Sequence, residues 1–177
     1  MIRTATQLKA LVRNMSKGNS TKAQIIIRYY VTERFLERLS LSQYKSNLLL
    51  KGGALVAAIA GLDNRSTMDV DATLNELPLS EDNARKVVED IVAVTIDDGM
   101  EFEITNVSTI MDESDYPGVR VILDTTLNKM HTPLKIDFST GDVITPREVE
   151  YSFRLLFEER SITILAYNIL KLSSYRK

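Results

Sequence analysis

Hydrophobic residues recur at helical spacing through the first forty positions of the chain. Leu8, Leu11, Val12 and Met15 follow the i, i+3, i+4, i+7 pattern, which predicts an amphipathic helix over Thr4 to Met15. Lys17-Gly18-Asn19 ends that pattern, and Ser20 is expected to cap a second helix that runs to about Leu39. The predicted buried stripe of the second helix is Ile26, Ile27, Tyr30, Val31, Phe35 and Leu39.

Shorter elements are predicted after these helices. Leu48 to Lys51 is typical of a strand, Gly53 to Ala60 of a small buried helix, and Met68 to Leu74 of another strand. A third helix opens at Ser80 or Glu81 and ends before the turn residues Asp97-Asp98-Gly99. A loop is expected over Asp112 to Gly118. Further strands are expected over Glu101–Ile110, Val119–Thr126, Leu134–Phe138, Arg154–Phe157 and Ile162–Ala166.

This order of elements predicts an α+β fold in which N-terminal helices pack against a mixed β-sheet. With 177 residues, of which 44% are hydrophobic, the chain has the size and composition of one globular domain. We expect residues 1–46 to form its helical part and residues 47–177 its sheet-containing core.

Composition narrows the chemistry that the chain can perform. It has no cysteine and one histidine, His131, which excludes disulfides, thiolate metal sites and multi-histidine metal sites. A bound metal would therefore be an oxygen-liganded ion such as Mg2+ or Mn2+. No stretch reaches 18 apolar residues and the first residues are not signal-like, so a soluble, cytoplasmic protein without membrane contact is expected.

Charge is unevenly distributed. Residues 1–51 contain ten Lys and Arg but only Glu33 and Glu37, a net charge of +8, whereas the remaining 12 Lys and Arg and 22 Asp and Glu give −10. A basic N-terminal third is typical of a surface that faces a polyanion. The alternative is that the two parts of the chain complement each other electrostatically.

The segment from Lys51 to Asp71 contains the strongest functional signal. Gly52 and Gly53 precede a predicted helix, where backbone N–H groups favour a phosphate, although a tight strand-to-helix turn would use the same glycines. Asp69 and Asp71 are two residues apart on a predicted strand, so their side chains project to the same face. Two carboxylates this close repel each other unless a cation lies between them, and a metal ion that also binds nucleotide phosphates would remove the repulsion.

A third carboxylate, Asp137, follows in the alternating strand Leu134 to Phe138. If this strand lies beside that of Asp69 and Asp71, Asp137 completes a carboxylate set, with Lys135 on its face. The alternative is a polar strand face without a ligand.

Together these motifs resemble the DNA polymerase β-like nucleotidyltransferase superfamily, and within it the AbiEii/AbiGii-type toxin nucleotidyltransferases of bacterial toxin–antitoxin and phage-abortive systems. The resemblance covers roughly residues 4–168. The matching segments are Glu33–Ser40, Leu49–Gly53, Arg65–Asp71, Lys135–Asp137 and Gly141–Asp142.

The resemblance implies a nucleotidyltransferase fold and transfer of a nucleotide from an NTP to an acceptor, with Mg2+ or Mn2+ as cofactor. It implies an RNA acceptor such as tRNA, or a protein acceptor, and neutralisation of the toxin by a cognate antitoxin protein. Asp69, Asp71 and Asp137 would be the catalytic residues and would bind the metal.

The same resemblance gives five residues a role in binding nucleotide phosphates: Lys51, Gly52, Gly53, Arg65 and Thr67. Arg65 and Thr67 match the family's lead-in to the acidic pair. Arg65 would contact phosphate or, equally, form an ion pair that steadies the turn.

The family continues with a glutamate–lysine helix and an Asp-x-x-Asp segment, whereas this sequence stops at Lys177. We therefore expect a truncated member that lacks the C-terminal helical region and associates into a homo-oligomer through the apolar surface left exposed. Two hypotheses follow: an active toxin enzyme, or an inactive scaffold that binds nucleotide, RNA or an antitoxin.

Overall fold

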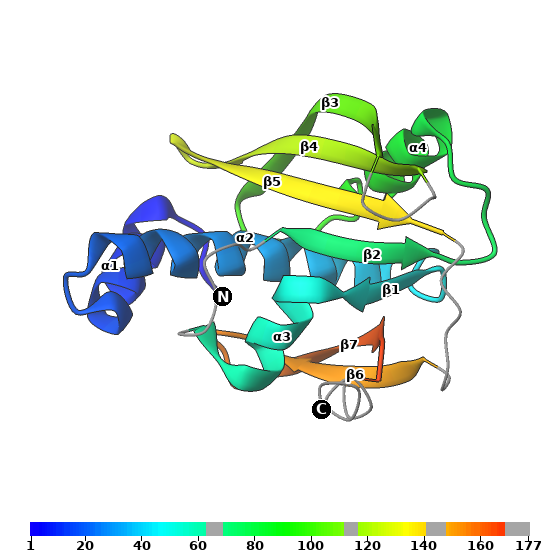
Figure 1. The fold of residues 1–177 in the computed structure, drawn as a ribbon. Coiled ribbons are helices and arrows are strands. Elements are labelled where there is room, and N and C mark those ends of the chain that lie inside the picture. The colour runs from blue at the N-terminus through cyan, green and yellow to red at the C-terminus, as the bar shows by residue number, and fades with distance from the viewer. Residues whose placement is uncertain (63–68, 112–116, 141–147, 169–177) are drawn as a thin grey trace.

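Two helices in contact with each other open the chain in the computed structural model, which describes residues 1–62, 69–111, 117–140 and 148–168 (Figure 1). Helix α1 (Ala5–Ser16) begins at a capping box, in which the Thr4 side chain and the Gln7 side chain each accept a backbone N–H of the other residue. Helix α2 (Ser20–Leu41) is capped by Asn19, not by Ser20 as predicted, because the Asn19 side chain accepts the Lys22 N–H.

One seven-stranded mixed sheet is formed by the described residues, in the order β3-β4-β5-β2-β1-β7-β6. Two short helices, α3 (Gly52–Ala60) and α4 (Glu81–Val92), connect its strands. The neighbouring pairs β2–β5 and β1–β7 are parallel and the others antiparallel. The strands are β1 (Leu48–Lys51), β2 (Val70–Leu74), β3 (Met100–Met111), β4 (Pro117–Leu127), β5 (Met130–Ser139), β6 (Val149–Arg154) and β7 (Ser161–Ala166). The predicted α+β fold with a mixed sheet is thus confirmed.

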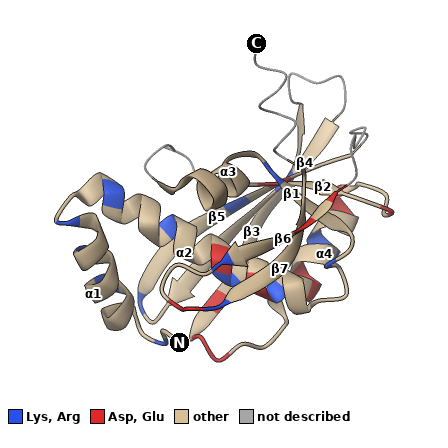
Figure 2. Ribbon diagram, turned by 90° about the horizontal axis from the view of Figure 1, so that it is seen from below, with Lys and Arg blue, Asp and Glu red and all other residues tan. Residues whose placement is uncertain are grey.

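The two faces of the sheet differ in what covers them. Helix α2 packs against β5 and β7, and α4 packs against β3 and β4 on the same face. Leu134, Ile136 and Phe138 of β5 are buried, while the alternate positions of β5 are half-buried or exposed. Helix α3 lies on the opposite face over β1 and β2 (Figures 1 and 2). Asp71, Arg120 and Asp137, whose side chains point to that face, are half-buried.

Several predicted elements shift in the structure. The strand predicted over Arg154–Phe157 is wrong: β6 ends at Arg154, and the Leu155 N–H instead donates to the Arg160 carbonyl across the turn into β7. The helix predicted to be buried over Gly53–Ala60 is buried on one side only, since half of the Ile59 side chain is exposed. Of the predicted loop at 112–118, residues 117–118 belong to β4, and residues 112–116 lie outside the described residues.

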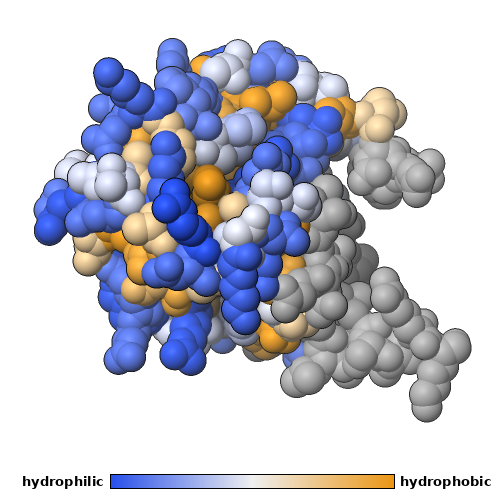
Figure 3. Space-filling view, turned by 90° about the vertical axis from the view of Figure 1, so that its left-hand side faces the viewer, coloured by the Kyte–Doolittle hydropathy of each residue, from blue (hydrophilic) through white to orange (hydrophobic). Residues whose placement is uncertain are grey.

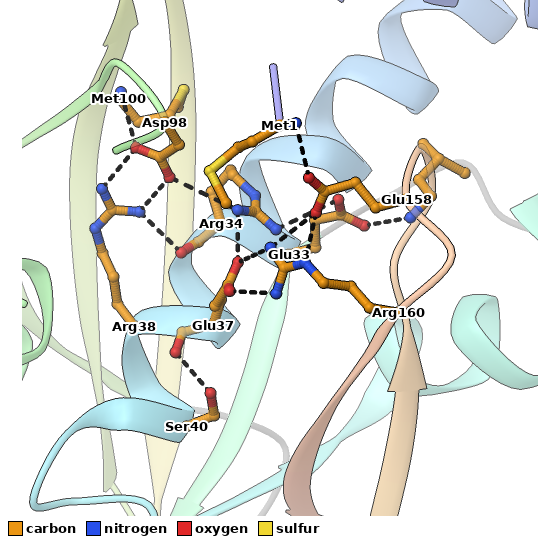
Figure 4. Close-up of polar contacts among 11 residues, drawn as sticks. Met1, Glu33, Arg34, Glu37, Arg38, Ser40, Asp98, Met100, Glu158 and Arg160 are labelled. Carbon is orange, nitrogen blue, oxygen red and sulfur yellow. Dashed lines mark hydrogen bonds and ion pairs between the residues drawn. The ribbon is translucent and has the colours of Figure 1, made fainter. Parts of the chain in front are cut away.

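A buried network of charged side chains joins α2 to both ends of the sheet (Figure 4). Asp98, fully buried, accepts hydrogen bonds from Arg38, and Arg34 pairs with Glu37 at 2.6 Å. Arg160, from the turn between β6 and β7, also binds Glu37. The pairs that Asp98 and Arg160 make with α2 connect segments 60 and 123 residues apart, so they fix α2 against the sheet whose other face carries the candidate site.

Among the described residues, no helix combines the length and the apolar character that a membrane crossing needs.

Candidate functional site

Four charged residues form a row across the half-exposed face of the sheet, one on each of four neighbouring strands. Asp71 of β2 is paired in register with Asp137 of the parallel strand β5. Lys51 of β1 lies beside Asp71, and Arg120 of β4 lies beside Asp137. Residues paired directly across strands project to the same side of a sheet. The row therefore runs cation, carboxylate, carboxylate, cation, with two like charges adjacent at its centre.

Arg120 holds Asp137 through two parallel hydrogen bonds. Its Nε donates to Asp137 Oδ1 at 2.8 Å, and its Nη2 donates to Asp137 Oδ2 at 3.0 Å. The hydrogen bonds to Asp137 raise the pKa of Arg120, and the charges of Asp137, Asp69 and Asp71 act in the same direction. All three predicted carboxylates thus contribute to the electrostatic field at one guanidinium group.

Asp69 immediately precedes β2 and pairs with a lysine of β5. Lys135 Nζ lies 3.1 Å from Asp69 Oδ2, and both side chains are about one-third exposed. Lys135 is two residues from Asp137 on the same strand, so it shares the face of the charged row, as the sequence predicted. The β5 motif Lys135-Ile136-Asp137 therefore supplies one cation and one carboxylate to the same face.

Gly52 is packed directly against Asp71. Its φ of +69° is a left-handed conformation that L side chains rarely adopt, and an added Cβ would overlap the Asp71 Oδ2 atom. Gly52 and Gly53 form the first turn of α3, where backbone N–H groups have no partner within the helix. Lys51 ends β1, and its Nζ donates to Ser139 Oγ at 2.6 Å. The glycine turn thus lies beside one of the predicted metal carboxylates.

The remaining predicted site residues, Arg65 and Thr67, fall outside the described residues. The residues that the structure describes include no group of three or more acidic or histidine side chains that already surround one metal position. The convergence of Asp69, Asp71 and Asp137 on a single cation consequently stays a prediction, as do the roles assigned to each site residue.

A groove opens beside Asp69, where β5 begins and α2 passes. Its volume is about 250 Å³. Ile122 provides an apolar wall, while Arg28 and Lys135 provide positive charge. Figure 3 views this end of the molecule, where apolar patches lie among hydrophilic side chains. The lining residues are Arg28, Asp69, Ile122, Pro133, Leu134 and Lys135.

A basic surface continues from the groove along α1 and the first turns of α2 (Figure 2). Residues 1–32 contain no Asp or Glu. Lys9, Arg13, Lys17 and Arg28 make no ion pair within the described part of the chain. Ion pairs with the described residues, the second of the two sequence interpretations, therefore do not account for these four cations.

Sequence reasoning missed Arg120 and Arg28 as members of the site. The alternation over Val119–Thr126 places Arg120 on the polar face of its strand, but only the β4–β5 register brings it to Asp137. Arg28 lies on the exposed side of α2, and its relation to Asp69 depends on how α2 crosses the sheet. Neither relation is encoded in local spacing.

Comparison with known families identifies the chain. The sequence profile described as "Nucleotidyl transferase AbiEii toxin, Type IV TA system" matches residues 34–172, well over half of the protein. The chain belongs to the AbiEii family. The matched range includes the glycine turn, all three carboxylates and Arg120, whereas α1 and most of the basic surface precede it. No curated protein matches this AbiEii chain significantly in sequence.

Two solved structures from Helicobacter pylori are similar to this AbiEii chain. One is described as a candidate nucleotidyltransferase, with 17% identity and a TM-score of 0.51 over 86% of this chain and 57% of that one. The other, JHP933, has 17% identity and a TM-score of 0.49 over 86% of this chain and 55% of its own. The first likeness supports the nucleotidyltransferase fold alone. This chain spans little more than half the length of either structure.

The donor chemistry of the acidic face fits a hard divalent cation. Asp69, Asp71 and Asp137 offer only oxygen ligands, which Mg2+ and Mn2+ prefer. Two of these carboxylates are adjacent in register, and each of Asp69 and Asp137 already attracts a cationic side chain. The site therefore concentrates negative charge on one face of the sheet, next to a helix N-terminus that favours phosphate.

Proposed function

We propose that this AbiEii chain is a metal-dependent toxin that transfers a nucleotide from an NTP to an RNA acceptor. The observation that supports this proposal most directly is the in-register pair of Asp71 and Asp137 beside the Gly52 turn. Asp69, Asp71 and Asp137 would hold Mg2+ or Mn2+, which would neutralise charge on the transferring phosphate and help to activate the acceptor hydroxyl.

The chain's own residues have distinct parts in this proposal. The first backbone N–H groups of α3 bind the triphosphate of the NTP, and Lys51 adds positive charge at the same end of β1. Lys135 and Arg120 balance the carboxylates when no nucleotide is bound. Gly52 keeps Asp71 in place because any larger residue would displace its carboxylate.

An RNA acceptor such as tRNA is favoured over a protein by the cations near the N-terminus that make no ion pair with the described residues. Lys9, Arg13 and Lys17 form a positively charged surface, and Arg28 extends it to the groove that opens on Asp69. Such a surface binds a phosphate backbone without base specificity. The groove would then accept the nucleotide that carries the reacting hydroxyl. A cognate antitoxin is the expected protein partner.

A second candidate is an inactive scaffold that binds nucleotide, RNA or an antitoxin. It is favoured by the contacts that Arg120 and Lys135 make with Asp137 and Asp69, since these compensate the acidic charge without a metal. Both candidates use the same face of the sheet, so they differ in catalysis and not in location.

One experiment separates the two candidates. The protein is incubated with Mg2+ or Mn2+, each labelled NTP in turn, and total tRNA, in parallel with Asp69→Asn and Asp71→Asn. Glu89→Gln, which alters an exposed carboxylate on α4, serves as the control. Label transfer that both aspartate variants abolish and the control retains supports the enzyme. Metal-dependent nucleotide binding without transfer supports a scaffold that binds nucleotide. If the protein shows no transfer and no nucleotide binding, the enzyme and the nucleotide-binding scaffold are both refuted.

A further inference from the structure

Arg120 occupies both oxygens of the carboxylate that the proposed metal site needs. The two hydrogen bonds to Asp137 measure 2.8 and 3.0 Å, the parallel geometry in which a guanidinium binds a carboxylate most strongly. The Asp137 side chain is 20% exposed and that of Arg120 is 34% exposed. The pair is therefore partly shielded from water but accessible to a small ion.

The position of Arg120 in the sheet makes this contact a fixed part of the fold. Arg120 and Asp137 are directly opposite each other on antiparallel strands, next to the last pair of the β4–β5 ladder, which continues in the other direction to Leu127 and Met130. Asp69 and Asp71 also act on the Arg120 charge. Arg120 on Asp137, together with Lys135 on Asp69, thus compensates carboxylates that would otherwise repel one another.

We propose that Arg120 is a positioning residue that competes with the divalent cation for Asp137. This inference rests on the proposed metal-dependent function. Without metal, Arg120 neutralises the acidic face and holds the Asp137 carboxylate in line with Asp71. When a cation binds, Arg120 releases at least one Asp137 oxygen. Arg120 therefore weakens cation binding and stabilises the metal-free protein.

Arg120 thus has opposite effects on cation affinity, which it lowers, and on the stability of the metal-free protein, which it raises. This combination distinguishes a competing residue from a purely structural one. A residue that only supported the fold would, when removed, lower both stability and cation affinity. Removal of a competitor lowers the stability of the metal-free protein and raises cation affinity, because the carboxylates then lack their internal partner.

The test measures Mn2+ binding by electron paramagnetic resonance, together with the melting temperature in EDTA and in Mn2+. Wild type is compared with Arg120→Gln and with Arg120→Lys, which keeps the charge but loses the forked geometry. Arg85→Gln, which removes an exposed arginine of α4 at 3.9 Å from Glu89, is the matched control. No catalytic assay is needed.

Arg120→Gln is expected to bind Mn2+ about tenfold more tightly than wild type, as the loss of one charge-assisted hydrogen bond predicts. Its melting temperature is expected to fall in EDTA and to recover in Mn2+. Arg120→Lys should be intermediate and Arg85→Gln unchanged. In the Asp137→Asn background, Arg120→Gln should give no further gain in affinity.

Unchanged or weaker Mn2+ binding by a folded Arg120→Gln or Arg120→Lys protein would overturn the inference. If wild type binds Mn2+ and Asp71→Asn abolishes that binding, the metal site stands even when the Arg120 inference fails. If neither wild type nor the Arg120 variants bind Mn2+, the proposed metal-dependent function fails and the inference fails with it.

Discussion

Arg38 and Asp98 form a bidentate ion pair inside the protein, between the last turns of α2 and the segment that leads into β3. Arg38 Nη1 donates to Asp98 Oδ2 at 2.7 Å, and Nη2 donates to Oδ1 at 2.9 Å. Asp98 also accepts the backbone N–H of Met100 at 3.0 Å. The carboxylate thereby joins α2 to the first residue of an edge strand.

Asp98→Asn is expected to lower the free energy of unfolding by about 3–5 kcal/mol, because it leaves the buried Arg38 charge without its partner. The adjacent residue provides a matched control. Asp97 is 80% exposed and pairs with the exposed Arg3, so Asp97→Asn should cost less than about 1 kcal/mol. Urea denaturation measures both values. Equal effects at the two positions would contradict the role assigned to Asp98.

Glu33 gives the protein a pH-dependent stability near neutrality. Burial raises the pKa of Glu33 to about 7, against the opposing effects of the Leu156 N–H and Arg34, while Glu158 and Glu37 raise it further. Between the unfolded value of 4.5 and 7, the folded state holds more protons than the unfolded state. Stability from this group is therefore present at low pH and is lost as pH rises through the folded pKa.

Glu33→Gln is expected to remove this dependence, since the amide oxygen can still accept the Leu156 N–H. From pH 5.5 to 8, wild type should lose about 2 kcal/mol of unfolding free energy relative to the variant. Burial favours a higher pKa for Glu37, but the hydrogen bond from Arg160 and the charge of Arg34 outweigh it and lower that pKa. Glu37 therefore changes the pH dependence of stability only below pH 5.5. Urea titrations at several pH values measure the difference, and parallel pH profiles would refute the assignment.

Gly52→Ala is expected to disrupt the candidate site more than the fold. The substitution adds a Cβ to a residue with left-handed backbone conformation, and that Cβ would occupy the space of the Asp71 carboxylate. A displacement of about 1 Å at a reacting group costs about a hundredfold in rate, so nucleotide transfer should fall by that order.

Gly18→Ala is the matched control for backbone strain. Gly18 also has a positive φ, +81°, but an added Cβ would meet nothing within 4 Å. Both variants should lower the melting temperature, whereas only Gly52→Ala should lower transfer and Mn2+ binding. Similar losses of transfer in the two variants would show that strain alone, and not the contact with Asp71, is responsible.

Neutralising the basic surface is expected to weaken acceptor binding. Replacing Lys9, Arg13 and Arg28 with alanine should raise the KM for RNA several-fold and reduce the salt slope of RNA affinity by about two, while NTP binding stays unchanged. Arg85→Ala, on α4, is the control. Fluorescence anisotropy with labelled RNA at several salt concentrations measures the slope. An unchanged slope would exclude this surface from acceptor binding.

The helices and most strands were predictable because their signals are local. Leu8 and Val12 repeat at helical spacing, and the buried residues of β5 alternate in the sequence as they do in the structure. Strand β6 was misplaced because the apolar run Leu155-Leu156-Phe157 looks more strand-like than the alternating Tyr151 and Phe153, yet it forms a turn.

The charged network of α2 was not predictable from the sequence. Glu33, Arg34, Glu37 and Arg38 resemble a solvated helix face, and they are buried only because Asp98 and Arg160 close over them from distant segments. The sequence places Asp137 next to Asp71 only if their two strands are neighbours in the sheet. The parallel pairing of β2 with β5 meets that condition. The ion pairs of Asp69 with Lys135 and of Asp137 with Arg120 could not be predicted, because they depend on how far side chains reach across neighbouring strands.

The pairing of β2 with β5 also has a consequence for synthesis of the protein on the ribosome. Helix α4 and strands β3 and β4 separate the two strands in the chain, so Asp71 emerges long before its neighbour. Contacts between such distant segments form late because a long loop must close first. A nascent chain therefore has no adjacent acidic pair until β5 has emerged and docked, so the proposed metal site can assemble only after most of the sheet has been synthesised.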